Sequence, residues 1–121
     1  MTEREQAIQL KIEKAKKIMA EVDILIEKKL YNTTITRLYY SCFEVTKALL
    51  LTKDLTPKTH RGVATLLHKH FVEENLFAKD KAAFFGSLMD ERNDADYGDF
   101  YIMDYETIAP LISRRKNTLV M

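Results

Sequence analysis

A chain of 121 residues with 46% hydrophobic and 31% charged residues has the size and composition of one globular domain with its own core. The single cysteine, Cys42, excludes an internal disulfide, and a formal net charge of +1 excludes a strong overall attraction to nucleic acid. No apolar run follows Met1 and no window reaches the length of a membrane span, which argues against a signal peptide and against membrane insertion.

The first half of the chain carries two long helical patterns. Between Thr2 and Lys29, apolar residues recur at alternating steps of four and three, which predicts an amphipathic helix with solvated Lys and Glu on its other faces. Asn32 is the predicted N-cap of a second helix, from Thr33 to about Lys53. Apolar residues cover more than half of its circumference, so we expect it in the middle of a bundle or against a second chain. The apolar positions are Ile8, Ile12, Ala15, Met19, Val22 and Ile26 in the first helix, and Ile35, Leu38, Tyr39, Cys42, Phe43, Val45, Leu49 and Leu50 in the second.

Two shorter helical patterns follow a loop. Thr56-Pro57 is a predicted cap and first helical position, and the third helical pattern runs from Thr59 to about Val72. Asp80 is the predicted cap of a fourth helix that runs to about Tyr97. Gly86 lies inside this fourth helix, where a glycine indicates close approach to a neighbouring helix.

A last helical pattern begins near Asp104, which is its predicted cap, and Pro110 should kink it or delay its start. Its predicted inward residues are Ile108, Leu111, Ile112 and Leu119. Nothing indicates an internal repeat or a second domain. The sequence therefore predicts an all-α fold, an antiparallel up-and-down bundle of four to five helices in one domain over residues 1–121.

The three histidines and the cysteine give little sign of a metal site. His60, His68 and His70 are spaced by eight and two residues, which does not match the i,i+4 spacing of ligands on one helical face. His60 opens the third helix and is a candidate for a polar cleft, whereas His68 and His70 are expected at the surface or the core edge. Cys42 has apolar neighbours, so we expect a small core residue and no catalytic thiol.

The fourth helical pattern places charged side chains where core residues are expected. Arg92 and Asp96 fall at helical spacing on the same side as Phe85. Arginine and aspartate are almost never fully buried unless they are paired. Two interpretations stay open, a buried Arg92–Asp96 pair that fixes helix packing and a functional site.

The second helix contributes two more polar side chains, Arg37 and Tyr40, in densely packed turns. A buried tyrosine hydroxyl usually needs a hydrogen-bond partner. The sequence therefore predicts a polar network that runs from these two residues to Arg92 or Asp96.

Three stretches together carry a family resemblance. They are RLYYSCFEVTKALL at 37–50, THRGV at 59–63 and RNDADYGDF at 92–100. Their combination resembles the HEPN superfamily (higher eukaryotes and prokaryotes nucleotide-binding), in its small single-domain prokaryotic branch. The resemblance implies a four- or five-helix bundle that usually forms a homodimer and is often encoded beside a minimal nucleotidyltransferase. Many members are metal-independent RNases that act as toxins in toxin–antitoxin pairs.

The cleavage motif of that family is an arginine followed by four to six residues and then a histidine, and a polar residue often comes directly after the arginine. Carried over, the arginine is Arg92 and its polar neighbour is Asn93. The histidine does not carry over, because four to six intervening residues lead from the arginine to Tyr97, Gly98 and Asp99, and no histidine follows His70.

Metal-independent RNA cleavage needs a group that takes the 2′-hydroxyl proton and groups that stabilise the pentavalent phosphorane. Arg92 would supply the stabilising charge as a bidentate phosphate ligand. Asp96 or His60 would handle protons if the fold or a dimer brings them to the arginine, and Tyr97 would donate a hydrogen bond or stack on a base. The remaining candidate binding residues are Asn93, Arg37 and Tyr40. No metal ion or cofactor is expected.

Three functional hypotheses follow from these residues. The first is an RNase toxin, with a possible minimal nucleotidyltransferase antitoxin as partner. The second is a non-catalytic helical dimer that binds a nucleotide or a nucleotidyltransferase, with Tyr97 as a possible target for adenylylation. The third is a satisfied core network of Arg92, Asp96, Arg37 and Tyr40, with the function elsewhere. In each case we expect a homodimer in the cytoplasm, away from membranes, with RNA or a nucleotide as the possible ligand of the first two.

Overall fold

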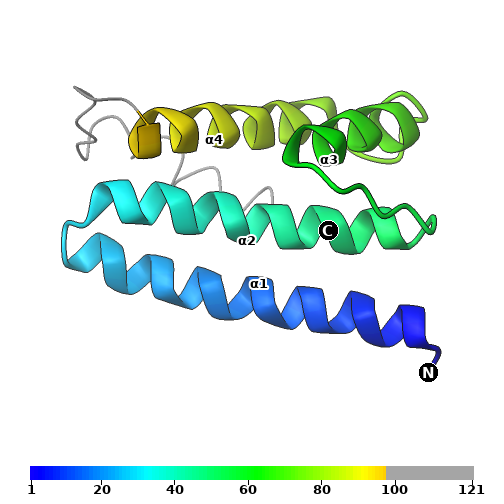
Figure 1. The fold of residues 1–121 in the computed structure, drawn as a ribbon, viewed down its shortest axis with the longest axis horizontal. Coiled ribbons are helices and arrows are strands. Elements are labelled where there is room, and N and C mark those ends of the chain that lie inside the picture. The colour runs from blue at the N-terminus through cyan, green and yellow to red at the C-terminus, as the bar shows by residue number, and fades with distance from the viewer. Residues whose placement is uncertain (98–121) are drawn as a thin grey trace.

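The computed structural model describes residues 1–97, and these form four α-helices that pack side by side (Figure 1). The helices are α1 (Glu3–Glu27), α2 (Tyr31–Leu51), α3 (His60–Leu67) and α4 (Lys79–Tyr97), and α3 continues through one π-helical turn, η1 (His68–Val72). The all-α helical bundle predicted from the sequence is confirmed. The expected last helix, with Asp104 as its cap and Pro110 within it, lies outside the described residues together with Ile108, Leu111, Ile112 and Leu119.

Helix α2 lies in the middle of the bundle, with α1 on one side and α3 and α4 on the other (Figure 1). The chain reverses direction between α1 and α2, and α4 runs back along α2. Residues on several faces of α2 are buried, including Ile35, Leu38 and Leu50, none of which is exposed to solvent. Burial of such a side chain stabilises the fold by about 1.5–3 kcal/mol. The broad apolar surface of this helix therefore reflects its central place. Among helices α1 to α4, none has the length and hydropathy of a membrane span.

The apolar stripe predicted for α1 contacts α2. Ala15 and Val22 are buried as expected, and Ile18, which the predicted stripe omits, is also buried. The hydroxyl of Ser41 on α2 donates a hydrogen bond to the carbonyl of Ala15 at 2.8 Å, so the two helices approach closely there. Ile18 lies three positions after Ala15 and four before Val22, so it shares the face of α1 that these two residues form.

The predicted caps of α2 and α3 are wrong. Asn32 lies inside α2, which begins at Tyr31 and has no side-chain cap, because Lys29 adopts a positive φ of 59° and reverses the chain within a few residues. Thr56-Pro57 lies in the loop before α3, and Thr59 is the N-cap instead. Its Oγ1 accepts a hydrogen bond from the backbone N–H of Gly62 at 2.9 Å, which is the usual capping geometry.

Asp80 is not the cap of α4, which begins one residue earlier, at Lys79. The carbonyl of Ala78 already accepts the N–H of Ala82 at 3.2 Å, so Asp80 lies in the first turn. Its carboxylate is favourable there because of the partial positive charge at a helix N-terminus. The predicted end of this helix at Tyr97 agrees with the structure.

Gly86 was expected to mark close contact between helices, but no described atom lies within 4 Å of a Cβ placed on it. Glycine within a helix is less favourable than alanine by about 0.5–1 kcal/mol. We therefore expect Gly86→Ala to raise the free energy of unfolding by about that amount, measured by urea denaturation. A loss of stability would instead place another segment or another chain against this position.

Candidate functional site

Two neighbouring tyrosines on α2, Tyr39 and Tyr40, receive polar side chains from two other helices. From α4, the Arg92 Nη2 donates a hydrogen bond to the Tyr40 hydroxyl at 3.0 Å, across 52 positions of sequence. The Arg92 guanidinium carbon lies 5.5 Å and 5.7 Å from the ring centroids of Tyr40 and Tyr39. From α3, the His60 Nδ1 lies 2.6 Å from the Tyr39 hydroxyl oxygen. The tyrosine pair thus brings a guanidinium and an imidazole to one place.

His60 owes its position to the start of α3. It is the first residue after the Thr59 cap, so the capping hydrogen bond fixes its backbone. Its ring stacks on Phe43 of α2, with the centroids 4.4 Å apart and the planes 11° from parallel. Stacking and the hydrogen bond to Tyr39 together hold the imidazole in one orientation.

The environment of His60 favours the neutral imidazole. Burial lowers its pKa from the ordinary value of 6.5, and the positive charges of Arg92 and Lys47 lower it further. A neutral imidazole carries one N–H donor and one acceptor nitrogen. At neutral pH His60 can therefore accept a proton.

The lowered pKa of His60 makes the stability of the fold depend on pH. Above the unfolded-state value of about 6.5, His60 is neutral in both states and its contribution is complete. As the pH falls below that value, the unfolded chain takes up the proton first, so we expect the free energy of unfolding to decrease until the pH passes the lowered folded pKa. Urea denaturation at several pH values measures this decrease, which should be smaller in His60→Phe than in the wild type. An identical pH dependence of both proteins would contradict the assignment.

Tyr39 is a structural neighbour of these groups and remains a neutral phenol. It has no exposed surface, and its ring lies parallel to Phe85 of α4, with the planes 3° apart. Burial raises its pKa to about 12, although the nearby Arg92 charge opposes the rise. Tyr39 can therefore donate or accept a hydrogen bond at neutral pH, but it does not act there as a base.

The structure brings together three of the seven residues predicted for the site, Arg92, Tyr40 and His60. The predicted link between Tyr40 and Arg92 is confirmed. Arg37 instead pairs through its Nε with Glu21 of α1 at 3.3 Å, and 45% of its side chain is exposed. The other three residues, Asn93, Asp96 and Tyr97, belong to the last turns of α4, and their side chains lie outside the described part.

Sequence reasoning missed two members of the cluster, Tyr39 and Phe43, and assigned both to the core. Both are indeed buried, and they also hold His60 through a hydrogen bond and through ring stacking. The signal available in the sequence was that a buried tyrosine hydroxyl usually needs a hydrogen-bond partner. It could not identify His60 as that partner, because 21 positions of sequence separate the two.

Other reactive side chains are placed as expected. Cys42 is buried, and burial raises the pKa of its thiol to about 12, which leaves it unreactive in the folded state. His68 is exposed and His70 is half-buried. Among the residues whose side chains the structure describes, which are 1–90 and Arg92, no three metal-ligating side chains cluster together.

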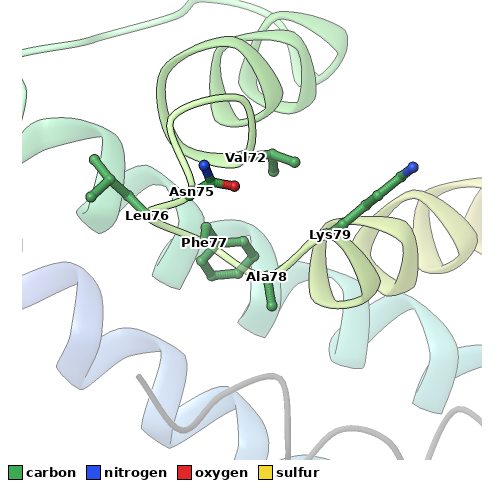
Figure 2. A pocket seen from close by; sticks show the side chains of 6 residues that line it. All are labelled: Val72, Asn75, Leu76, Phe77, Ala78 and Lys79. Carbon is green, nitrogen blue, oxygen red and sulfur yellow. The ribbon is translucent and has the colours of Figure 1, made fainter.

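A surface pocket of about 450 Å³ lies where η1 leads into α4 (Figure 2). Its lining residues are Val72, Asn75, Leu76, Phe77, Ala78 and Lys79. These offer one amide and one ammonium group, and they do not include the arginine, histidine or tyrosines described above. Since Lys79 and Arg92 are 13 residues apart on one helix, the pocket lies about 20 Å from the arginine along α4.

Comparison with known proteins gives a family match over most of the chain. The sequence model of the HEPN domain matches residues 8–117. Two similar proteins of Methanocaldococcus jannaschii are named "Putative toxin MJ0142" and "Putative toxin MJ0605". They are 36% and 38% identical to this chain over 86 and 92 residues, which cover 71% and 76% of it.

The same two matches cover 58% and 69% of the relatives themselves, so the chain spans little more than half the length of the first. A Thermotoga maritima protein, named "UPF0332 protein", is 25% identical over 119 residues. That match covers 98% of this chain and 90% of the relative.

Proposed function

Because the chain belongs to the HEPN domain family, we propose that it is a metal-independent RNA endonuclease of the toxin type. Two relatives carry the word toxin in their names, which supports the toxin role. The observation that carries the chemistry is the placement of Arg92 and His60 on the same tyrosine pair. One is a permanent cation and the other a neutral imidazole, which are the two kinds of group that RNA cleavage needs.

In the proposed reaction, the 2′ oxygen of a ribose attacks the adjacent phosphorus. The new P–O2′ bond forms as the P–O5′ bond breaks, which leaves a 2′,3′-cyclic phosphate and a 5′-hydroxyl. His60 takes the proton from the 2′-hydroxyl, and the resulting imidazolium returns a proton to the 5′ oxygen. Arg92 donates hydrogen bonds to the phosphorane oxygens, where negative charge accumulates.

Tyr39 has a defined part in this scheme. For the Nε2 of His60 to accept a proton, Nδ1 must carry the hydrogen of the neutral ring and donate it to the Tyr39 hydroxyl oxygen. The 2.6 Å separation of these two atoms allows that hydrogen bond. Among the described residues, Tyr39 and Cys42 are held protonated by their raised pKa values, so His60 is the better base at neutral pH.

In the proposed reaction, His60 takes the role of the histidine that the family motif lacks in this chain. In the motif the histidine follows the arginine on the same segment, whereas here His60 comes from the start of α3. As partners we propose a second copy of the chain and a minimal nucleotidyltransferase antitoxin. Their support is the family membership.

A second candidate function is a non-catalytic module that binds a nucleotide or a nucleotidyltransferase. One observation favours it, namely that Arg92 and His60 already have hydrogen-bond partners in Tyr40 and Tyr39. In this alternative the cluster positions the helices and presents positive charge, but it does not exchange protons with RNA.

The two functions are distinguished by incubation of the purified chain with end-labelled RNA in the presence of EDTA. The endonuclease predicts cleavage that EDTA does not inhibit and products that end in a 2′,3′-cyclic phosphate. A 2′-deoxy substitution at the cut position should prevent the reaction, because the attacking hydroxyl is gone. RNA that remains intact would contradict the endonuclease and favour the binding module.

A further inference from the structure

Lys47 lies on α2 one helical turn after Phe43, and its side chain bends back toward that residue. The Lys47 Nζ is 4.8 Å from the centroid of the Phe43 ring, on which His60 stacks. Only 28% of the Lys47 side chain is exposed, which is low for a lysine. The ammonium group is therefore held over the ring on which the imidazole stacks, and it does not extend freely into solvent.

A buried carboxylate fixes Lys47 in this position. The Oε1 of Glu44, whose side chain is 8% exposed, lies 3.5 Å from the Lys47 Nζ and also 3.5 Å from the Lys14 Nζ of α1. Since one carboxylate is shared by two ammonium groups, the three side chains together keep one net positive charge. Glu44 thus orients Lys47 without neutralising the group as a whole.

Lys47 and Arg92 occupy equivalent places on two neighbouring rings. The Arg92 guanidinium lies over Tyr40 and the Lys47 ammonium lies over Phe43, and the two ring centroids are 6.3 Å apart. His60 contacts both rings, with centroid distances of 6.1 Å to Tyr40 and 4.4 Å to Phe43. Besides burial, both positive charges lower the pKa of His60, so both act on the imidazole through space.

We propose that Lys47 is a second phosphate-binding residue of the Arg92–His60 site, and that the ligand is an internal segment of an RNA strand. The inference rests on the proposed function, in which His60 acts on a ribose hydroxyl. Cations over the two rings that this imidazole contacts fit the two phosphates that flank one ribose. An internal nucleotide of RNA has this arrangement, whereas a mononucleotide carries its phosphates on one side only.

The test measures the binding of a short fluorescent RNA whose 2′ positions are methylated, so that it cannot be cleaved. Fluorescence anisotropy over a series of salt concentrations gives the slope of log K against log salt, to which each phosphate contact with a single strand contributes about −0.7. We expect Lys47→Met to make the slope shallower by about 0.7. Lys14→Met is the matched control, because it removes the other partner of Glu44 and should leave the slope unchanged.

A second measurement tests the placement of Lys47 without RNA. In NMR titrations, the pKa of His60 should rise toward its ordinary value in Lys47→Met and stay as in the wild type in Lys14→Met. Circular dichroism confirms that each variant is folded. Equal His60 pKa values in both variants would contradict the placement.

The outcomes separate this inference from the proposed function. A slope that is unchanged in Lys47→Met but shallower in Arg92→Gln overturns the role of Lys47 and leaves the endonuclease in place. A shallower slope in Lys47→Met, with no cleavage of ordinary RNA by the wild type, supports the RNA-binding role and overturns the endonuclease. Displacement of the labelled RNA by ADP as readily as by unlabelled RNA would contradict the preference for an internal segment.

Discussion

RNA cleavage is expected to fall by about 10²- to 10³-fold when Arg92 is replaced by alanine. The guanidinium is the described cation that both contacts the tyrosine pair and lies close enough to His60 to lower its pKa. Its removal leaves the negative charge of the phosphorane without its main hydrogen-bond donor. Arg92→Lys keeps the charge but lacks the planar fork, so we expect an intermediate rate.

The measurement is the single-turnover rate with end-labelled RNA, because it isolates the chemical step. Arg4→Ala is a suitable control, since this substitution also removes one positive charge and Arg4 lies in the first turn of α1. Thermal unfolding of each variant separates a lost functional group from a lost fold. Cleavage by folded Arg92→Ala at the wild-type rate would contradict the role of the arginine.

Replacement of His60 by phenylalanine is expected to lower the cleavage rate by about 10²- to 10⁴-fold, the usual contribution of a general acid–base group. Phenylalanine can keep the ring stacked on Phe43 but removes both nitrogens. The wild-type rate should fall as the pH drops through the lowered pKa of His60, because only the neutral imidazole takes the 2′-hydroxyl proton. This acidic limb should be absent from any residual activity of His60→Phe.

His68→Phe is the matched control for this variant. It makes the same substitution at an exposed histidine, the first residue of η1, directly after the end of α3. We expect its rate and its pH profile to equal those of the wild type. An acidic limb that persists in His60→Phe would assign the proton transfer to another group.

The periodicity of apolar residues was sufficient to predict the bundle. The buried Phe85 on α4 and the buried Ala15 and Val22 on α1 all occupy predicted positions. This succeeds because helical spacing alone decides which residues share a face, and a shared apolar face must be buried. Arg92 was recognised by the same logic, since an arginine on an apolar face needs a partner.

The failures concern features that depend on local turns or on contacts distant in sequence. The positive φ of Lys29 shortens the first connection and displaces the start of α2, and nothing in residue type marks it. Arg37 pairs with Glu21 of α1, and the residue spacing within one helix does not reveal such a contact between two helices. The contact of His60 with Tyr39 needs the whole path of the loop before α3, which the pattern does not encode.

The most direct test of the central claim, that Arg92 and His60 act on one phosphodiester, is a double-mutant cycle on RNA cleavage. The rates of the wild type, Arg92→Ala, His60→Phe and the double variant are compared under single-turnover conditions. If both groups serve the same transition state, the double variant should be about as slow as the slower single variant. The claim would be contradicted if the rate loss of the double variant equalled the product of the two single losses. It would also be contradicted if the wild-type protein left RNA intact.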